Sequence, residues 1–202
     1  MAKPSTTIVS VTYNARKTIG ALLDAIKPAH DSGEVIVIVA DNASADDTDG
    51  YVREHYPWVK RIQNGGNIGF GRGCNAGFAH VETEYVLFLN PDAVLEPDAL
   101  RVMLAFMEAH PRCGLAGPAM LYPGGGLQAA GMLLTPTGVI KAAAGLGLRA
   151  FPTRREIEPG SAPFLTNWVC GACMLLPTAV YREVGMMDSR FFLYFEETDL
   201  CQ

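Results

Sequence analysis

The stretch that decides the fold is Glu34-Val35-Ile36-Val37-Ile38-Val39-Ala40, which passes directly into Asp41-Asn42-Ala43-Ser44. Its unbroken apolar run is typical of a parallel strand that is covered by helices on both faces. The polar residues follow where such a strand ends, at the edge where open α/β sheets bind ligands. This stretch therefore predicts a parallel α/β sheet with a binding site at its carboxyl edge.

Strand and helix patterns alternate on both sides of this stretch. Further strands are predicted at Thr7–Val11, Val59–Ile62, Tyr85–Leu89 and Trp168–Leu176. Helices are predicted around Ile19–Ile26, after Ser44 as a capping residue, at Gly71–Ala79 and at Pro97–Ala109. This alternation predicts a parallel sheet with right-handed crossovers.

The pattern changes after residue 110. Gly124-Gly125-Gly126, Pro136 and Gly138 separate short segments, which favours hairpins or a mixed extension of the sheet. The prolines and paired arginines of Arg149–Pro163 predict a mobile loop. With 202 residues, the chain is expected to form one domain.

Composition narrows the class of protein. Apolar residues make up 49% of the chain and charged residues 18%, which is the balance of a folded protein. The net charge is -5 and no basic stripe stands out, so nucleic acid is not an expected partner. Met1–Ser5 shows no signal-peptide core, and no run reaches the about 18 apolar residues of a membrane span. A cytoplasmic protein is expected, with peripheral association at the inner face of the membrane as an option.

The chain has five cysteines, an odd number that argues against a disulfide framework. Cys170-Gly171-Ala172-Cys173 has the spacing of a zinc or redox pair, but a zinc site needs a second pair. We interpret these cysteines as small buried residues of a strand.

Polar residues that core packing does not require follow each of the first four predicted strands. They are Thr12-Tyr13-Asn14, Asp41-Asn42-Ala43-Ser44, the stretch from Asn67 to Asn75, and Asn90-Pro91-Asp92-Ala93. Because the carboxyl ends of parallel strands meet at one edge, the agreement of four strand ends favours a single binding site.

Each strand end also has a structural interpretation. Thr12 and Asn14 suit a helix cap, and Asp41 suits either a turn or acceptance of a base N–H or a ribose hydroxyl. Asn90-Pro91-Asp92 suits a turn, yet a carboxylate past a buried strand also suits Mg²⁺ or Mn²⁺. Gly69, Gly71 and Gly73 lack dinucleotide spacing, which disfavours a Rossmann dehydrogenase. They suit a flexible turn or a close backbone approach to phosphate.

The last segment, Phe191–Leu200, sets Glu196, Glu197 and Asp199 after a run of aromatic residues. Acids in the first turn of a solvated helix are one interpretation. The aromatic residues favour another, a partly dry wall that would raise the pKa of a carboxyl group, as suits a general base.

Together these stretches resemble the family-2 glycosyltransferases of the GT-A fold, and most of all their rhamnosyltransferase-like branch. The matching stretches run in family order over nearly the whole chain. They are Val11–Asn14, Asp41–Ser44, Asn67–Asn75, Phe88–Asp92, Gly171–Met174 and Phe191–Cys201. The resemblance implies a Rossmann-like, mostly parallel sheet with a mixed C-terminal extension.

The resemblance also implies roles for the strand-end residues. Thr12 and Asp41 are expected to line the nucleotide base and ribose, with Arg72 and Asn75 nearby. Asp92 is expected to bind the divalent metal, Mn²⁺ or Mg²⁺, and through it the diphosphate. The remaining expected nucleotide contacts are Tyr13, Asn14, Asn42, Asn67, Gly69 and Asn90.

Two departures from the family pattern matter. Asn90 stands where the metal motif has its first acid, which leaves Asp92 as the metal carboxylate. Glu196-Glu197 stands where the family has a Glu-Asp pair, so Glu197 is the expected base, with Asp199 as first alternative and Glu196 as second. The nucleotide-binding half is expected at residues 1–110 and the acceptor-side half at 111–202. Because related enzymes continue past Gln202, part of the acceptor site is expected to be missing.

The implied activity is a direct, inverting displacement. A sugar, with rhamnose as the candidate, would move from a UDP- or dTDP-sugar to a saccharide or lipid-linked acceptor in cell-surface polysaccharide synthesis. One alternative is a nucleotidyltransferase, but that needs a basic glycine-rich loop where Thr12-Tyr13-Asn14-Ala15 stands. The other is a non-catalytic module that binds nucleotide sugars.

Overall fold

The computed structural model describes residues 4–122, 125–126, 162–166 and 168–202. Its sheet has five strands in the order β3-β2-β1-β4-β5. The strands are β1 (Thr6–Thr12), β2 (Val35–Asp41), β3 (Lys60–Gln63), β4 (Tyr85–Leu89) and β5 (Cys173–Pro177). The pairs among β1 to β4 are parallel, and β5 runs antiparallel to β4. The expected GT-A type of sheet, mostly parallel with a mixed extension, is confirmed.

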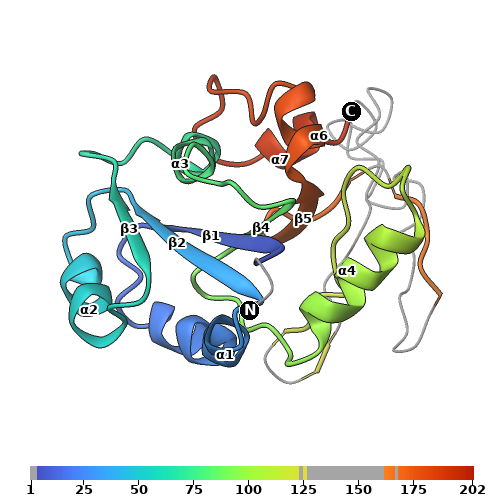
Figure 1. Cartoon of the computed structure of the whole chain (residues 1–202). Coiled ribbons are helices and arrows are strands. Elements are labelled where there is room, and N and C mark those ends of the chain that lie inside the picture. Colours follow the sequence, from blue (N-terminus) through green and yellow to red (C-terminus); the bar gives the residue numbers. More distant parts are fainter. Residues whose placement is uncertain (1–3, 123–124, 127–161, 167) are drawn as a thin grey trace.

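Helices cover both faces of this sheet (Figure 1). They are α1 (Ile19–Asp31), α2 (Thr48–His55), α3 (Phe70–Phe78), α4 (Ala99–Ala109), α6 (Thr178–Glu183) and α7 (Glu196–Leu200). Alternate residues of a strand point to opposite faces, so Ile8 packs with α1, α2 and α4 while Val9 packs with α3 and α6. The result is a three-layer α/β/α arrangement with a core on each side of the sheet.

The register brings two predicted site residues side by side. Thr12 pairs with Asp41 across β1 and β2, and Asp41 pairs with Gln63 of β3. On the other side, the last residue of β4, Leu89, pairs with Cys173 of β5. The polar stretches that follow β1, β2, β3 and β4 therefore start from one edge of the sheet.

Some predicted boundaries need correction. The helix after β2 begins at Thr48, with Asp47 in a left-handed conformation before it, so the expected Ser44 cap is wrong. Ser44 instead turns back and donates its hydroxyl to Asp41. The helix expected from Pro97 begins at Ala99, and the strand expected from Trp168 begins at Cys173.

Two further predictions concern the segment between α4 and β5. The expected hairpins around Gly124–Gly138 and the expected loop Arg149–Pro163 fall largely outside the described residues. Within the described ranges, Cys173 is buried in β5 and no cluster of His, Cys, Asp and Glu is suited to hold a metal by itself. In the same ranges, every helix is too short or too polar to cross a bilayer.

Candidate active site

The ends of β1 and β2 are joined by a buried carboxylate. Asp41 is 2% exposed and accepts a hydrogen bond from the Thr12 hydroxyl at 2.7 Å. The Ser44 amide donates to the other carboxylate oxygen at 2.9 Å, so Asp41 does hold a turn. With the Ser44 hydroxyl, these three bonds leave about one of the four acceptor positions of a carboxylate free.

Tyr13 and Asn14 extend this strand-end cluster toward solvent. The Asn14 amide donates to the Ser44 hydroxyl at 2.8 Å, and the Asn14 side-chain oxygen accepts from the Ala45 amide at 2.8 Å. The first helix has Thr18 at its N-cap, so the helix-cap interpretation of Thr12 and Asn14 is wrong. Asn14 joins two loops, while the Tyr13 ring is 53% exposed and open to contact.

Asparagines connect the ends of β2 and β3. Asn42 is buried and accepts a hydrogen bond from the Asn64 side chain at 2.8 Å. Its own amide group donates to the carbonyl oxygen of Gly69 at 3.1 Å and lies 3.4 Å from the Asn67 oxygen. Asn64 was not identified as a site residue from the sequence. Its position directly after β3 is the one signal that could have pointed to it.

The start of α3 lies very close to the segment that precedes α7. Gly69 has a φ of 89°, and a Cβ built on it would lie 2.2 Å from the Phe192 carbonyl oxygen. The next amide, of Phe70, donates to that same oxygen at 3.0 Å. The sequence therefore has a glycine here because two backbones are in close contact, which leaves no room for a side chain.

Two residues expected near the nucleotide hold the same segment. Arg72 donates from Nε to the Ser189 carbonyl oxygen at 2.6 Å. Asn75 donates to the Met187 carbonyl oxygen at 2.7 Å and accepts from the Tyr181 hydroxyl at 2.6 Å. Both side chains therefore have partners within the protein, and their contact with a nucleotide stays a prediction. Sequence reasoning missed Tyr181, which is buried between Phe78 and Phe88.

Past β4, the chain makes the turn that Asn90-Pro91-Asp92 favours. The Ala93 amide donates to the Asn90 carbonyl oxygen at 3.1 Å, and the Asn90 amide donates to the Ala172 carbonyl oxygen at 2.9 Å. Asp92 is exposed at this turn. Its carboxylate is thus presented to solvent by a loop that is bonded to the residues just before β5.

The expected aromatic wall before α7 is wrong. Phe192, Tyr194 and Phe195 are 55%, 69% and 56% exposed, so their rings do not shield a carboxyl group. Tyr194 and Phe195 both have positive φ, near 70°, a backbone turn that the residue types do not signal. This turn directs the aromatic side chains outward and brings α7 back against α3.

The three acids of α7 have different surroundings. Glu196 is 2% exposed, Glu197 is half-buried and Asp199 is exposed. Burial raises the pKa of the Glu196 carboxyl, and the neighbouring charge of Glu197 raises it further. Glu197 lies against Gly171, where an added Cβ would be 3.6 Å from the Glu197 Cγ and Cδ atoms. The raised pKa expected of an acid in this segment thus belongs to Glu196, and its cause is burial.

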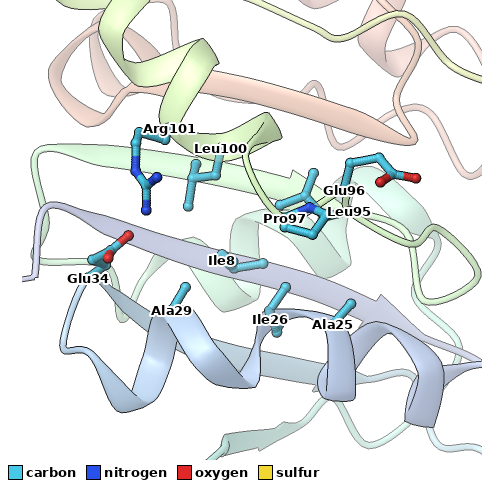
Figure 2. A pocket seen from close by; sticks show the side chains of 10 residues that line it. All are labelled: Ile8, Ala25, Ile26, Ala29, Glu34, Leu95, Glu96, Pro97, Leu100 and Arg101. Atoms are coloured by element: carbon cyan, nitrogen blue, oxygen red, sulfur yellow. The ribbon is translucent and has the colours of Figure 1, made fainter.

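A small hollow between α1 and α4 lies away from this cluster (Figure 2). Ile8, Ile26 and Leu100 line it, with Glu34 and Arg101 also at its wall. Its volume of about 30 Å³ leaves room for only a few water molecules. It faces the helix layer opposite α3, so it is not part of the strand-end site.

Solved structures define the class to which this fold belongs. The chain matches S. aureus TarS 1–349 in complex with UDP at a TM-score of 0.65, with 18% identity over 98% of this chain and 54% of that one. It matches the mannosyltransferase PcManGT from Pyrobaculum calidifontis, solved with GDP-Man and Mn²⁺, at 0.67, with 18% identity over 99% and 51%. The fold is therefore that of the GT-A glycosyltransferases.

The sequence then places the chain within that class. Residues 7–184 match the family model described as glycosyl transferase family 2, and the chain belongs to this family. A relative in Mycobacterium tuberculosis, N-acetylglucosaminyl-diphospho-decaprenol L-rhamnosyltransferase, is 28% identical over 96% of this chain and 68% of its own length. The predictions of a glycosyltransferase and of a rhamnosyltransferase-like resemblance are confirmed. The chain spans about half the length of the two solved structures.

Proposed function

We propose that this protein transfers a sugar, with L-rhamnose as the leading candidate, from a UDP- or dTDP-sugar to a lipid-linked saccharide, with inversion at the anomeric carbon. The rhamnosyltransferase relative and its diphospho-decaprenol acceptor support this choice of substrates. One observation carries the proposal. The Asn90 amide bonds to Ala172, next to the Gly171 against which Glu197 lies, so the loop of Asp92 and the segment of Glu197 adjoin.

The proposed reaction is a single displacement. The Glu197 carboxylate takes the proton of the acceptor hydroxyl while that oxygen attacks the anomeric carbon. The bond from the anomeric carbon to the diphosphate oxygen breaks, and the nucleoside diphosphate leaves with that electron pair. Thr12, Asp41 and the asparagines around Asn42 are proposed to hold the nucleoside at residues 1–110. Residues 111–202 are proposed to face the acceptor.

Asp92 is the proposed metal ligand. Its exposed carboxylate fits Mn²⁺ or Mg²⁺ when diphosphate oxygens and water complete the coordination, as these ions prefer. A metal ion there supplies positive charge beside the leaving diphosphate. The solved mannosyltransferase of similar fold contains Mn²⁺. A lipid-linked acceptor also leads us to propose peripheral work at the cytoplasmic face of the membrane.

The activity is tested by transfer itself. The enzyme is incubated with Mn²⁺, a panel of UDP-, dTDP- and GDP-sugars that includes dTDP-L-rhamnose, and a synthetic N-acetylglucosaminyl-diphospho-polyprenol. Mass spectrometry then measures the glycosylated lipid. We expect product from a pyrimidine-linked donor and none from GDP-sugars. Donor binding without transfer or hydrolysis across the whole panel would instead identify a non-catalytic binding module.

Asp41→Ala is expected to weaken binding of UDP or dTDP by about 1–3 kcal/mol, because a nucleotide donor group then loses its partner. Isothermal titration calorimetry measures the change. Asp31→Asn is a matched control, since it removes one carboxylate at the exposed end of α1. Equal binding of GDP and UDP that Asp41→Ala does not change would contradict this nucleotide site.

Metal binding is expected to depend on the nucleotide. With Asp92 as the one firm carboxylate, the protein without nucleotide should bind Mn²⁺ poorly and gain affinity when UDP is added. Asp92→Asn should abolish the Mn²⁺-dependent part of nucleotide binding, whereas Asp98→Asn, at an exposed pair with Arg101, should not. Thermal shifts with UDP, with and without Mn²⁺, measure this. Tight Mn²⁺ binding in the absence of nucleotide would count against the assignment.

A further inference from the structure

The two adjacent glutamates at the start of α7 lie against two different glycines. A Cβ added at Gly71 of α3 would be 3.5 Å from the Cβ and Cγ of Glu196. A Cβ added at Gly171 would be 3.6 Å from the Cγ and Cδ of Glu197. Each side chain therefore packs beside a different glycine. Glu196 turns into the protein, and Glu197 turns toward the residues before β5.

The carboxyl group of Glu196 is buried without a charge partner. Among the described residues, its Oε2 atom has no hydrogen-bond partner, and no Lys, Arg or His forms an ion pair with it. Burial and the charge of Glu197 raise the pKa of Glu196, and they outweigh hydrogen bonds from the backbone at Glu196 and Tyr194 that act to lower it. The buried Cys74 thiol of α3 also lies near Glu196, and burial raises the pKa of that thiol. An isolated buried carboxylate is costly, whereas a protonated carboxyl group at such a site is much less so.

The arginines on the neighbouring segments are bound elsewhere. Arg72 of α3 donates to the Ser189 carbonyl oxygen at 2.6 Å. Arg190 pairs with Asp188, which holds the pKa of that carboxyl below its ordinary value. Neither arginine therefore offsets a negative charge on Glu196. Burial raises the pKa of Glu196, which agrees with a protonated carboxyl group at a site that lacks a positive partner.

We propose that Glu196 is a positioning residue, held as an uncharged carboxylic acid against Gly71, which fixes the first turn of α7 and leaves Glu197 as the ionised member of the pair. This inference rests on the proposed role of Glu197 as base. Two ionised carboxyl groups on adjacent residues would oppose each other's charge. With Glu196 neutral, Glu197 keeps its charge and its place beside Gly171.

The stability of Glu196→Gln as a function of pH tests the protonation state without any need for activity. Well below the ordinary carboxyl pKa, 4.5, the folded and unfolded wild type both hold the proton, so the difference in stability between variant and wild type should not change with pH there. Above that value the unfolded wild type releases the proton while the folded protein retains it, so wild-type stability falls until the folded pKa is passed. The Tm of Glu196→Gln minus that of the wild type should therefore grow as pH rises from 4.5.

Glu183→Gln removes an exposed carboxylate of α6 and controls for the loss of one charge. A Tm difference for Glu196→Gln that stays flat from acid to neutral pH would overturn the proposal. A difference that falls as pH rises would also overturn it, because it would mean that Glu196 is ionised and paired.

The pH profile of kcat then tests the effect on Glu197. If Glu196 is already neutral, Glu196→Gln should keep the acidic limb of the profile in place and keep turnover within a few-fold. If Glu196 is ionised, removal of its charge should move that limb to lower pH, which would overturn the proposal. Glu196→Ala removes the buried carboxyl group and the Cγ beside Gly71, and it should lower kcat by up to about 10²-fold at unchanged donor KM. Wild-type turnover in Glu196→Ala would refute the positioning role. A wild type that transfers no sugar would refute the proposed function while leaving the stability test valid.

Discussion

Glu197→Gln is expected to lower sugar-transfer turnover by about 10²–10⁴-fold, the range typical of the loss of a general base. Gln keeps the size of the side chain and its contact with Gly171 but cannot accept a proton. Because Glu197 is proposed to act on the acceptor hydroxyl, the affinity for the donor should stay unchanged. Single-turnover rates and donor titration, measured on the same preparation, separate the two effects.

Asp199→Asn is the matched control for this change. Asp199 lies two residues further along α7 and is exposed, so it should point to a different side of the helix from Glu197. We expect this variant to keep most of its turnover. If Asp199→Asn is inactive and Glu197→Gln is normal, Asp199 is the base. If neither variant loses activity, α7 is scaffold and the proposed mechanism fails.

Gly69→Ala is expected to lower the free energy of unfolding by about 2–6 kcal/mol, as the sum of backbone strain and overpacking. The φ of 89° and ψ of 172° belong to a region that is essentially restricted to glycine. The added methyl group would also collide with the Phe192 carbonyl oxygen, which is backbone and has little room to move. Urea denaturation followed by circular dichroism measures the loss.

Gly66→Ala tests whether this loss is specific to the contact. Gly66 lies three residues earlier, has no positive φ and has no atom near the position of an added Cβ. Its replacement should leave stability unchanged or raise it by up to about 1 kcal/mol. If Gly69→Ala is as stable as Gly66→Ala, the close contact between α3 and the segment before α7 is not a structural requirement.

The first four strands could be predicted from the sequence to within one or two residues. The apolar runs of β1, β2 and β4 are long enough to need cover on both faces, and few other structures satisfy such runs. The third strand, β3, is short and partly exposed. The position of the site followed directly, because parallel strands bring Thr12 and Asp41 to one edge. The predictions for the apolar strands depend only on which residues are buried, and apolar residue types indicate burial directly.

The site details that depend on side-chain direction could not be predicted. Ser44 is a residue type that often caps helices, but its hydroxyl donates instead to the Asp41 carboxylate. Hydrogen bonds to a charged acceptor are stronger than those to a neutral one. Asn75 is polar and follows a glycine-rich stretch, yet both ends of its amide bind within the protein. A local pattern names the hydrogen-bonding groups, whereas distant segments decide which partners they meet.

The surroundings of the α7 acids were hidden for a related reason. Three acids at a helix start are typical of a solvated turn, and the sequence offers no sign that one of them is buried. The burial of Glu196 depends on the positive φ of Tyr194 and Phe195, residues that seldom adopt it. It also depends on packing against α3, whose Gly71 is next to Glu196 in the fold but far away in the chain.

The pairing at β5 has a consequence for how such enzymes diversify. Ala116 and Leu175 bond to each other through both of their amides, so the chain between them begins and ends at one fixed point on β5. For a flexible closed loop, each doubling in length costs only about 0.6 kcal/mol of chain entropy. A change of chain length between Ala116 and Gly171 is thermodynamically inexpensive by this measure, provided that Gly171 and Ala172 keep their contacts with Glu197 and Asn90. Evolution or design can therefore vary the length of the chain before Gly171 while the strand β5 stays paired with β4.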